Sequence, residues 1–156
     1  MKIKIYLDSG ADISCLNNLE CEFYQFPYDS PDRPKRLIKK GIIKLAVPSE
    51  TQWRDSNETW EESIFPWNEH CGSSHYEALL DLITHNSKKT KEALRRDVLH
   101  LDSAYKTGCC IFITSDKDIF SKRLEIEILC NIKVFQSHKE SKELVEYIQT
   151  IISKKI

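Results

Sequence analysis

Short apolar segments alternate along this chain with segments of helical spacing, and this alternation constrains the fold more than any other feature. The strand-like segments are residues 2–7, 42–47, 109–114 and 132–135. The segments with a helical pattern are residues 48–63, 75–94, 95–107, 118–128 and 138–153. Strands separated by helices usually pair in parallel, and the helices pack on the sheet. The sequence therefore predicts an α/β fold, with a mostly parallel central sheet and helices on both faces.

Glycine, proline and small polar residues mark the expected breaks between these elements. Residues 9–12, Ser-Gly-Ala-Asp, predict a turn that caps a short helix reaching about Leu19. Residues 20–34 hold three prolines and predict an irregular loop. A short basic helix is expected near 34–40, with Gly41 as its C-terminal cap. We expect an irregular insertion at 56–74 and a C-terminal helix within 137–156.

The length of 156 residues fits a single domain, since domains commonly contain about 100–150 residues. An apolar fraction of 40% and a charged fraction of 30% indicate a folded chain rather than a disordered one. No apolar stretch approaches the roughly 18–20 residues that span a bilayer, so no membrane partner is expected. The six cysteines include no C-x₂-C pair, which favours reduced cysteines and a cytoplasmic location.

Four aspartates lie at predicted strand ends or in predicted helices: Asp8, Asp55, Asp97 and Asp116. In a parallel sheet the site lies beyond the carboxyl ends of the strands, where Asp8 and Asp116 are expected. Two carboxylates about 4 Å apart repel each other by roughly 4 kcal/mol, so a cluster needs a neutralising cation. Mg²⁺ and Mn²⁺ prefer oxygen ligands and assist phosphodiester hydrolysis. The pattern therefore predicts a metal-dependent phosphodiesterase.

Each of these acids also has an ordinary structural interpretation. Asp8 can cap the following helix, and Asp55 and Asp97 fit the first turn of a helix, where the helix dipole favours an acid. Asp116 and Asp118 fit a turn. Taken singly, none of these acids indicates a site. Their joint placement favours one.

Charge is unevenly distributed, although the formal net charge is only −1. Two runs are basic: Arg33, Lys35, Arg36, Lys39, Lys40 and Lys44, and then Lys88, Lys89, Lys91, Arg95 and Arg96. An acidic segment extends from Asp55 to Glu69. The basic runs are either solvated helix faces or rims that guide phosphates toward the acidic centre.

Four motifs carry a family resemblance. Residues 97–104, Asp-Val-Leu-His-Leu-Asp-Ser-Ala, match the pattern acid-x-x-His-x-x-x-Ala on a helix. Gly108-Cys109, an apolar strand and Thr114-Ser115-Asp116 follow. Near the N-terminus a strand ends in Leu7-Asp8, and Val47-Pro48-Ser49 is followed by Asp55 at the expected distance. In these motifs residues 2–135 resemble the PIN-domain ribonuclease family.

The resemblance implies an endoribonuclease that depends on Mg²⁺ or Mn²⁺. Its catalytic acids would be Asp8, Asp55, Asp97 and Asp116, and its metal ligands Asp8, Asp97, Asp116 and Asp118. Glu50 and Glu58 are alternatives to Asp55 as the second acid. The implied partners are single-stranded or structured RNA, an antitoxin or other regulatory protein, and a second copy of the chain. A role as a toxin or defence effector follows from the same resemblance.

Other functions stay open. A PIN-like fold without catalysis would serve as an RNA-binding or scaffolding module. A phosphotransfer enzyme with Asp8 as nucleophile would need a second aspartate where this chain has Gly10. A receiver-like domain would need a buried lysine near the acids, and Lys117 lies in a predicted turn. In the family pattern that this chain resembles, His100 would be a packing or hydrogen-bonding residue rather than a general base.

Overall fold

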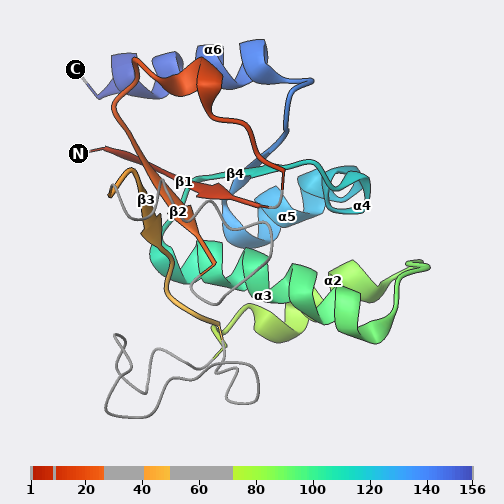
Figure 1. Cartoon of the computed structure of the whole chain (residues 1–156). Coiled ribbons are helices and arrows are strands. Elements are labelled where there is room, and N and C mark those ends of the chain that lie inside the picture. Colours follow the sequence, from red (N-terminus) through yellow and green to blue (C-terminus); the bar gives the residue numbers. More distant parts are fainter. Residues whose placement is uncertain (1, 9, 27–40, 50–71, 156) are drawn as a thin grey trace, which may run out of the picture.

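A computed structural model describes residues 2–8, 10–26, 41–49 and 72–155. Within these residues the centre of the protein is a five-stranded sheet in which every neighbouring pair of strands is parallel (Figure 1). The strands are β1 (Ile3–Leu7), β2 (Cys21–Gln25), β3 (Ile43–Leu45), β4 (Ile111–Thr114) and β5 (Lys133–Gln136). Their order across the sheet is β3-β2-β1-β4-β5. The predicted α/β fold with a parallel sheet is confirmed.

Helices cover both faces of the sheet (Figure 1). The described helices are the 3₁₀ turn η1 (Ser14–Leu16), α2 (Tyr76–Thr84), α3 (Lys91–Thr107), α4 (Lys117–Ser121), α5 (Arg123–Cys130) and α6 (Ser141–Lys154). α6 and η1 lie on one face, and α2, α3 and α5 lie on the other.

Two hydrophobic cores result from this arrangement, because successive side chains of a strand point to opposite faces. In β1, Ile3, Ile5 and Leu7 pack with Leu144 and Ile148 of α6. The intervening Tyr6 packs in the other core, which contains residues of α2, α3 and α5. The central strands β1 and β4 are buried over nearly their whole length. β1 and β4 therefore form a buried support for the residues that follow their carboxyl ends.

Local signals fix the ends of the helices that flank this edge. At the start of α3 the Thr90 side chain accepts a hydrogen bond from the Ala93 N–H. At its end Gly108 adopts a φ of 77°, the left-handed conformation that glycine takes at helix C-termini. The ammonium of Lys122 donates to the carbonyl groups of Leu82, Ile83 and His85 at the end of α2. It thereby satisfies carbonyls that lack partners within the helix.

Several predicted boundaries were wrong. Residues 21–25, predicted as part of a loop, form β2, whose positions are all half-buried and so show no alternating pattern. The predicted helix 75–94 ends at Thr84, and the next helix begins at Lys91, because the polar connection contains Asn86 at a φ of 55°. The predicted helix 118–128 is two helices that meet at Lys122. The short helix before Leu19 is only the 3₁₀ turn η1.

The other predicted elements either agree with the structure or lie outside the described residues. The strand predicted at 42–47 is β3, residues 43–45, and the C-terminal helix begins at Ser141. The helices predicted near 34–40 and 48–63 lie wholly or mostly outside the described residues. None of the described helices has the length and apolarity that crossing a membrane requires.

Candidate functional site

Two of the predicted acids, Asp8 and Asp116, lie next to each other at the carboxyl edge of the sheet. Asp8 follows β1 and Asp116 follows β4, and these two strands are neighbours. Thr114, the last residue of β4, joins the two acids. Its hydroxyl donates a 2.7 Å hydrogen bond to Asp8 Oδ2 and accepts a 3.0 Å bond from the Asp116 backbone N–H. The strand register therefore fixes Asp8 relative to Asp116.

Asp116 uses its two carboxylate oxygens for different purposes. Its Oδ1 caps α4 by accepting hydrogen bonds from the backbone N–H groups of Asp118 at 2.8 Å and Ile119 at 3.3 Å. Its Oδ2 faces the ammonium of Lys89 at 2.5 Å. Burial raises the pKa of Asp116, but the hydrogen bonds from Lys89 and the α4 backbone lower it more, so its pKa lies below the usual value.

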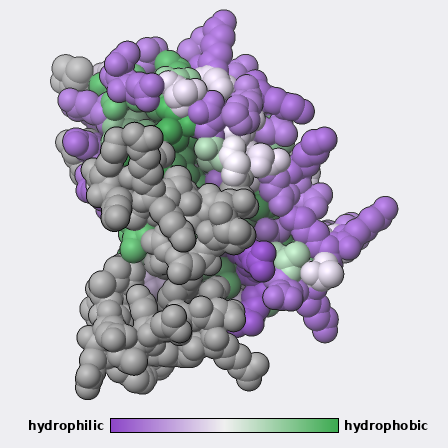
Figure 2. All heavy atoms as spheres, in the orientation of Figure 1, coloured by the Kyte–Doolittle hydropathy of each residue, from purple (hydrophilic) through white to green (hydrophobic). Residues whose placement is uncertain are grey.

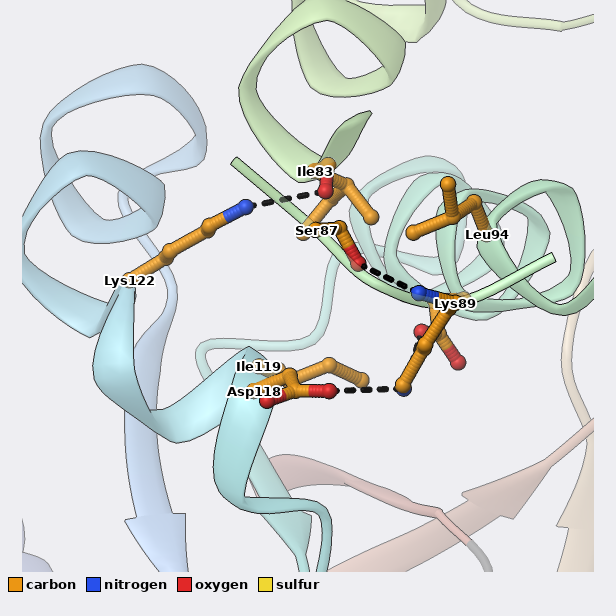
Figure 3. A pocket seen from close by; sticks show the side chains of 8 residues that line it. Ile83, Ser87, Lys89, Leu94, Asp118, Ile119 and Lys122 are labelled. Carbon is orange, nitrogen blue, oxygen red and sulfur yellow. Dashed lines mark hydrogen bonds and ion pairs between the residues drawn. The ribbon is translucent and has the colours of Figure 1, made fainter. Parts of the chain in front are cut away.

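A lysine ammonium occupies the centre of the acidic group. Lys89 Nζ lies 2.7 Å from Asp97 Oδ2, 2.5 Å from Asp116 Oδ2 and 3.8 Å from Asp118 Oδ2. Figure 3 shows Lys89 reaching from the connection between α2 and α3 toward Asp118 at the start of α4. Burial lowers the pKa of Lys89, and the bonds to Asp116 and Asp97 overcome this effect and raise it. Lys89 is therefore charged at neutral pH.

The same surroundings shift the pKa of Asp97 in the opposite direction to that of Asp116. Burial raises its pKa, Lys89 opposes this effect, and the negative charges of Asp116 and Asp8 add to the increase. The pKa of Asp97 therefore lies above its usual value, whereas that of Asp116 lies below. The difference arises because the backbone of α4 supports the Asp116 charge and Asp97 receives no comparable support. The three acids thus form one electrostatic group.

Asp8 also faces a buried aromatic network. His100 Nδ1 lies 3.6 Å from Asp8 Oδ1 and 2.8 Å from the Tyr6 hydroxyl. The His100 ring stacks on Phe26, with ring centroids 4.6 Å apart. Burial lowers the pKa of His100, Asp8 raises it and Arg96 lowers it further, so the imidazole is neutral at neutral pH. The packing and hydrogen-bonding role expected for His100 matches these contacts.

The predicted acids differ in how far the fold brings them together. Asp97 and Asp116 meet at one cation, Asp8 lies beside them, and Asp118 lies at the rim with 65% of its side chain exposed. Asp55, together with its alternatives Glu50 and Glu58, lies outside the described residues. Lys89 was predicted only as one member of a basic run. No spacing rule indicates that this lysine, rather than its neighbours, turns inward.

The donor chemistry of the group suits a hard divalent cation. Mg²⁺ commonly binds through one or two carboxylates and keeps several waters, and Asp97 and Asp116 already converge on one positive charge. In the described part of the chain, no three His, Cys, Asp or Glu side chains are arranged to hold a metal ion together. The Asp97–Asp116 pair is therefore the candidate metal position, with the Lys89 ammonium as its stand-in ion.

A small cavity of about 10 Å³ lies beside this pair, large enough for about one water molecule. Its apolar lining residues are Ile83, Leu94 and Ile119 (Figure 3). Its polar lining residues are Ser87, Lys89, Asp97, Asp118 and Lys122. Hydrophilic side chains cover the end of the molecule where α4 and the connection between α2 and α3 lie (Figure 2).

Comparison of the chain with protein-family models, with curated proteins and with solved structures finds no match in any of the three.

Proposed function

We propose that this protein is a metal-dependent endoribonuclease that hydrolyses RNA phosphodiester bonds at the carboxyl edge of its sheet. The observation that supports this proposal most is the meeting of Asp97 and Asp116 at one cation, with Asp8 beside them. These acids come from β1, α3 and the start of α4, so tertiary structure and not sequence proximity brings them together. The motif resemblance to PIN-domain ribonucleases supports the same activity.

Mg²⁺ or Mn²⁺ at this position would activate a water and stabilise the charge that develops on the phosphodiester oxygens. The side chains of Asp97 and Asp116 would hold the ion, and Asp55 would complete the set of catalytic acids. Thr114 fixes the orientation of Asp8 through their 2.7 Å hydrogen bond. In this orientation Asp8 would either bind the ion or orient the attacking water.

Phosphate groups would approach over the start of α3. Lys91 and Arg96 are exposed there, within two turns of Asp97 on α3, and Lys88 is exposed in the connection that precedes this helix. Positive side chains beside an acidic centre attract a nucleic acid backbone without being metal ligands. The choice of RNA over DNA comes from the family resemblance, as do a regulatory partner protein and dimer formation. We place the activity in the cytoplasm as part of the same proposal.

Cleavage of labelled single-stranded RNA, hairpin RNA and single-stranded DNA tests the proposal, with Mn²⁺, Mg²⁺ or EDTA present. Asp97→Asn and Asp116→Asn are compared with wild type and with Asp81→Asn, which changes an exposed acid on α2. We expect metal-dependent RNA cleavage that both site variants lose and Asp81→Asn retains. Folding of each variant is checked by circular dichroism. Cleavage that survives both site substitutions would refute the assignment of the acids.

A catalytically inactive RNA-binding or scaffolding module is the second candidate. The observation that favours it is Lys89, because an ammonium between Asp97 and Asp116 already offsets part of their negative charge without a metal. This candidate predicts RNA binding without cleavage, and binding that Asp116→Asn leaves unchanged. The cleavage experiment, extended by a binding measurement on the same RNAs, separates the two functions.

A further inference from the structure

We propose that the Lys89 ammonium and a divalent metal ion are alternative occupants of the Asp97–Asp116 pair, so that metal binds only when the Lys89 side chain withdraws. This inference depends on the metal site of the proposed function and adds a regulatory residue to it. It makes Lys89 an internal competitor that reduces the negative charge of the metal-free site.

The competition follows from how the carboxylate oxygens are used. Asp116 Oδ1 is engaged by two backbone N–H groups of α4, which leaves Oδ2 as the oxygen directed at the site. Lys89 holds this oxygen at 2.5 Å and also holds Asp97 Oδ2 at 2.7 Å. A metal ion bound between these two oxygens would take the position that the Lys89 ammonium occupies. The two cations therefore exclude each other from this position.

The fold gives Lys89 a way to withdraw without unfolding the site. The backbone around it is held, since the Lys89 N–H donates to Ser87 Oγ and Lys122 anchors the end of α2 through three carbonyls. The side chain itself is flexible and 23% exposed. Rotation of its methylene groups moves the ammonium while the connection between α2 and α3 stays in place.

Asp118 provides the nearest new partner for the displaced ammonium. Its Oδ2 already lies 3.8 Å from Lys89 Nζ, and 65% of its side chain is exposed. The small cavity lined by Lys89, Asp97 and Asp118 adds room for about one water beside the pair. A short movement toward Asp118 would therefore free Asp97 and Asp116 and keep the lysine paired at the rim (Figure 3).

Mn²⁺ titration of the metal-free full chain by isothermal calorimetry tests this competition. Lys89→Met removes the competing charge and keeps the aliphatic bulk. We expect Lys89→Met to bind Mn²⁺ about tenfold tighter than wild type, because the Lys89 bonds to Asp97 and Asp116 no longer have to be broken. Lys139→Met, which changes an exposed lysine before α6, should bind Mn²⁺ like wild type. The double variant Lys89→Met/Asp116→Asn should lose the gain. Equal or weaker binding by Lys89→Met would overturn the proposal.

A measurement on wild type covers the case in which Lys89→Met does not fold. The side-chain ¹⁵N resonance of a hydrogen-bonded lysine ammonium can be followed by NMR during titration with Mg²⁺. We expect the Lys89 signal to shift or disappear as Mg²⁺ saturates the site, while the signal of Lys106, whose ammonium donates to the Pro48 carbonyl, stays unchanged. A constant Lys89 signal at saturation would refute displacement, as would the absence of any Mg²⁺ or Mn²⁺ binding.

The RNA cleavage assay distinguishes failure of this inference from failure of the proposed function. Metal-dependent cleavage together with equal Mn²⁺ affinity in wild type and Lys89→Met would leave the nuclease standing and remove the competition. Tighter Mn²⁺ binding by Lys89→Met without cleavage of any tested RNA would leave the competition standing and remove the nuclease.

Discussion

Ser49 donates a 2.7 Å hydrogen bond to Asp102, and both side chains are fully buried. The backbone N–H and the hydroxyl of Ser73 donate to the same carboxyl group. Asp102 lies on α3, Ser49 follows β3 and Ser73 precedes α2. One buried carboxyl group therefore holds two segments that are distant in sequence against the central helix.

Asp102→Ala should consequently destabilise the protein by about 3 kcal/mol, because it leaves buried hydrogen-bond donors without a partner. Urea unfolding followed by circular dichroism would measure the loss. Ser49→Ala removes one donor and should cost only about 1 kcal/mol. Asp81→Asn, an exposed change on α2, serves as the control and should leave the unfolding midpoint in place. If Asp102→Ala unfolds at the wild-type midpoint, Asp102 does not have this role.

Lys122 has a comparable role at the end of α2. Its ammonium donates to three backbone carbonyls, at 3.0 Å for Leu82, 2.9 Å for Ile83 and 2.8 Å for His85. Lys122→Met keeps the aliphatic part of the side chain and removes the donors, and should destabilise the protein by about 1–2 kcal/mol. Thermal unfolding checks this value. Lys139→Met, at an exposed lysine, is the control. Equal melting temperatures for the two variants would show that the capping contacts contribute nothing.

The sequence predicted β1 to within one residue and missed β2 altogether. β1 is a central strand in which Ile3, Ile5 and Leu7 are buried on one face, so its apolar alternation is strong. β2 lies between β1 and the edge strand β3, and each of its residues is half-buried. Its segment, Cys21–Gln25, therefore lacks the alternation that identifies a strand. The prolines that follow it suggested a loop over the whole region.

Of the residues of the candidate site, only the acids could be predicted from the sequence. Asp8 and Asp116 follow predicted strands, and the parallel sheet places both at one edge whatever the loops do. Lys89 was not predictable, because its partners depend on how the connection between α2 and α3 folds back over α4. Local sequence patterns carry no information about such a contact. Asp102 was missed for the same reason, since its partners Ser49 and Ser73 come from other segments.

Thr114 provides a test of how precisely Asp8 must be held. Thr114→Val keeps the shape of the side chain and removes both the bond to Asp8 Oδ2 and the acceptor for the Asp116 N–H. If the protein is the proposed nuclease, we expect RNA cleavage to fall by about tenfold or more, since removing one oriented group commonly costs this much. Thr114→Ser restores the hydroxyl and should recover most of the activity. Wild-type cleavage rates in Thr114→Val would contradict this role.

His100 should make the stability of the metal-free protein depend on pH. Burial lowers its pKa in the folded state below the value of about 6.5 in the unfolded state. The folded protein therefore binds the proton less readily. The contribution of the neutral imidazole is complete above pH 6.5 and is lost as the pH falls through the folded pKa.

Urea unfolding at pH 7.5, 6.5 and 5.5 measures this dependence for wild type and His100→Gln. We expect His100→Gln to be less stable than wild type at pH 7.5, because it loses the stacking on Phe26 and the hydrogen bond with Tyr6. The difference should shrink toward pH 5.5, where wild type loses its contribution and the variant does not. A difference that is constant with pH would mean that His100 has the same pKa in both states.

Gly10 links the loop after β1 to the loop after β4, and a side chain at this position would disturb both. Its φ of 75° is unfavourable for other residues, and an added Cβ would lie 2.7 Å from Ser115 Oγ. Gly10→Ala should therefore destabilise the protein by about 1–3 kcal/mol, through backbone strain and steric contact together. Adding Ser115→Ala removes the closest atom and should recover the steric part only. Ser115→Ala alone is the reference, and additive costs in the double variant would show that the two loops do not meet at this point.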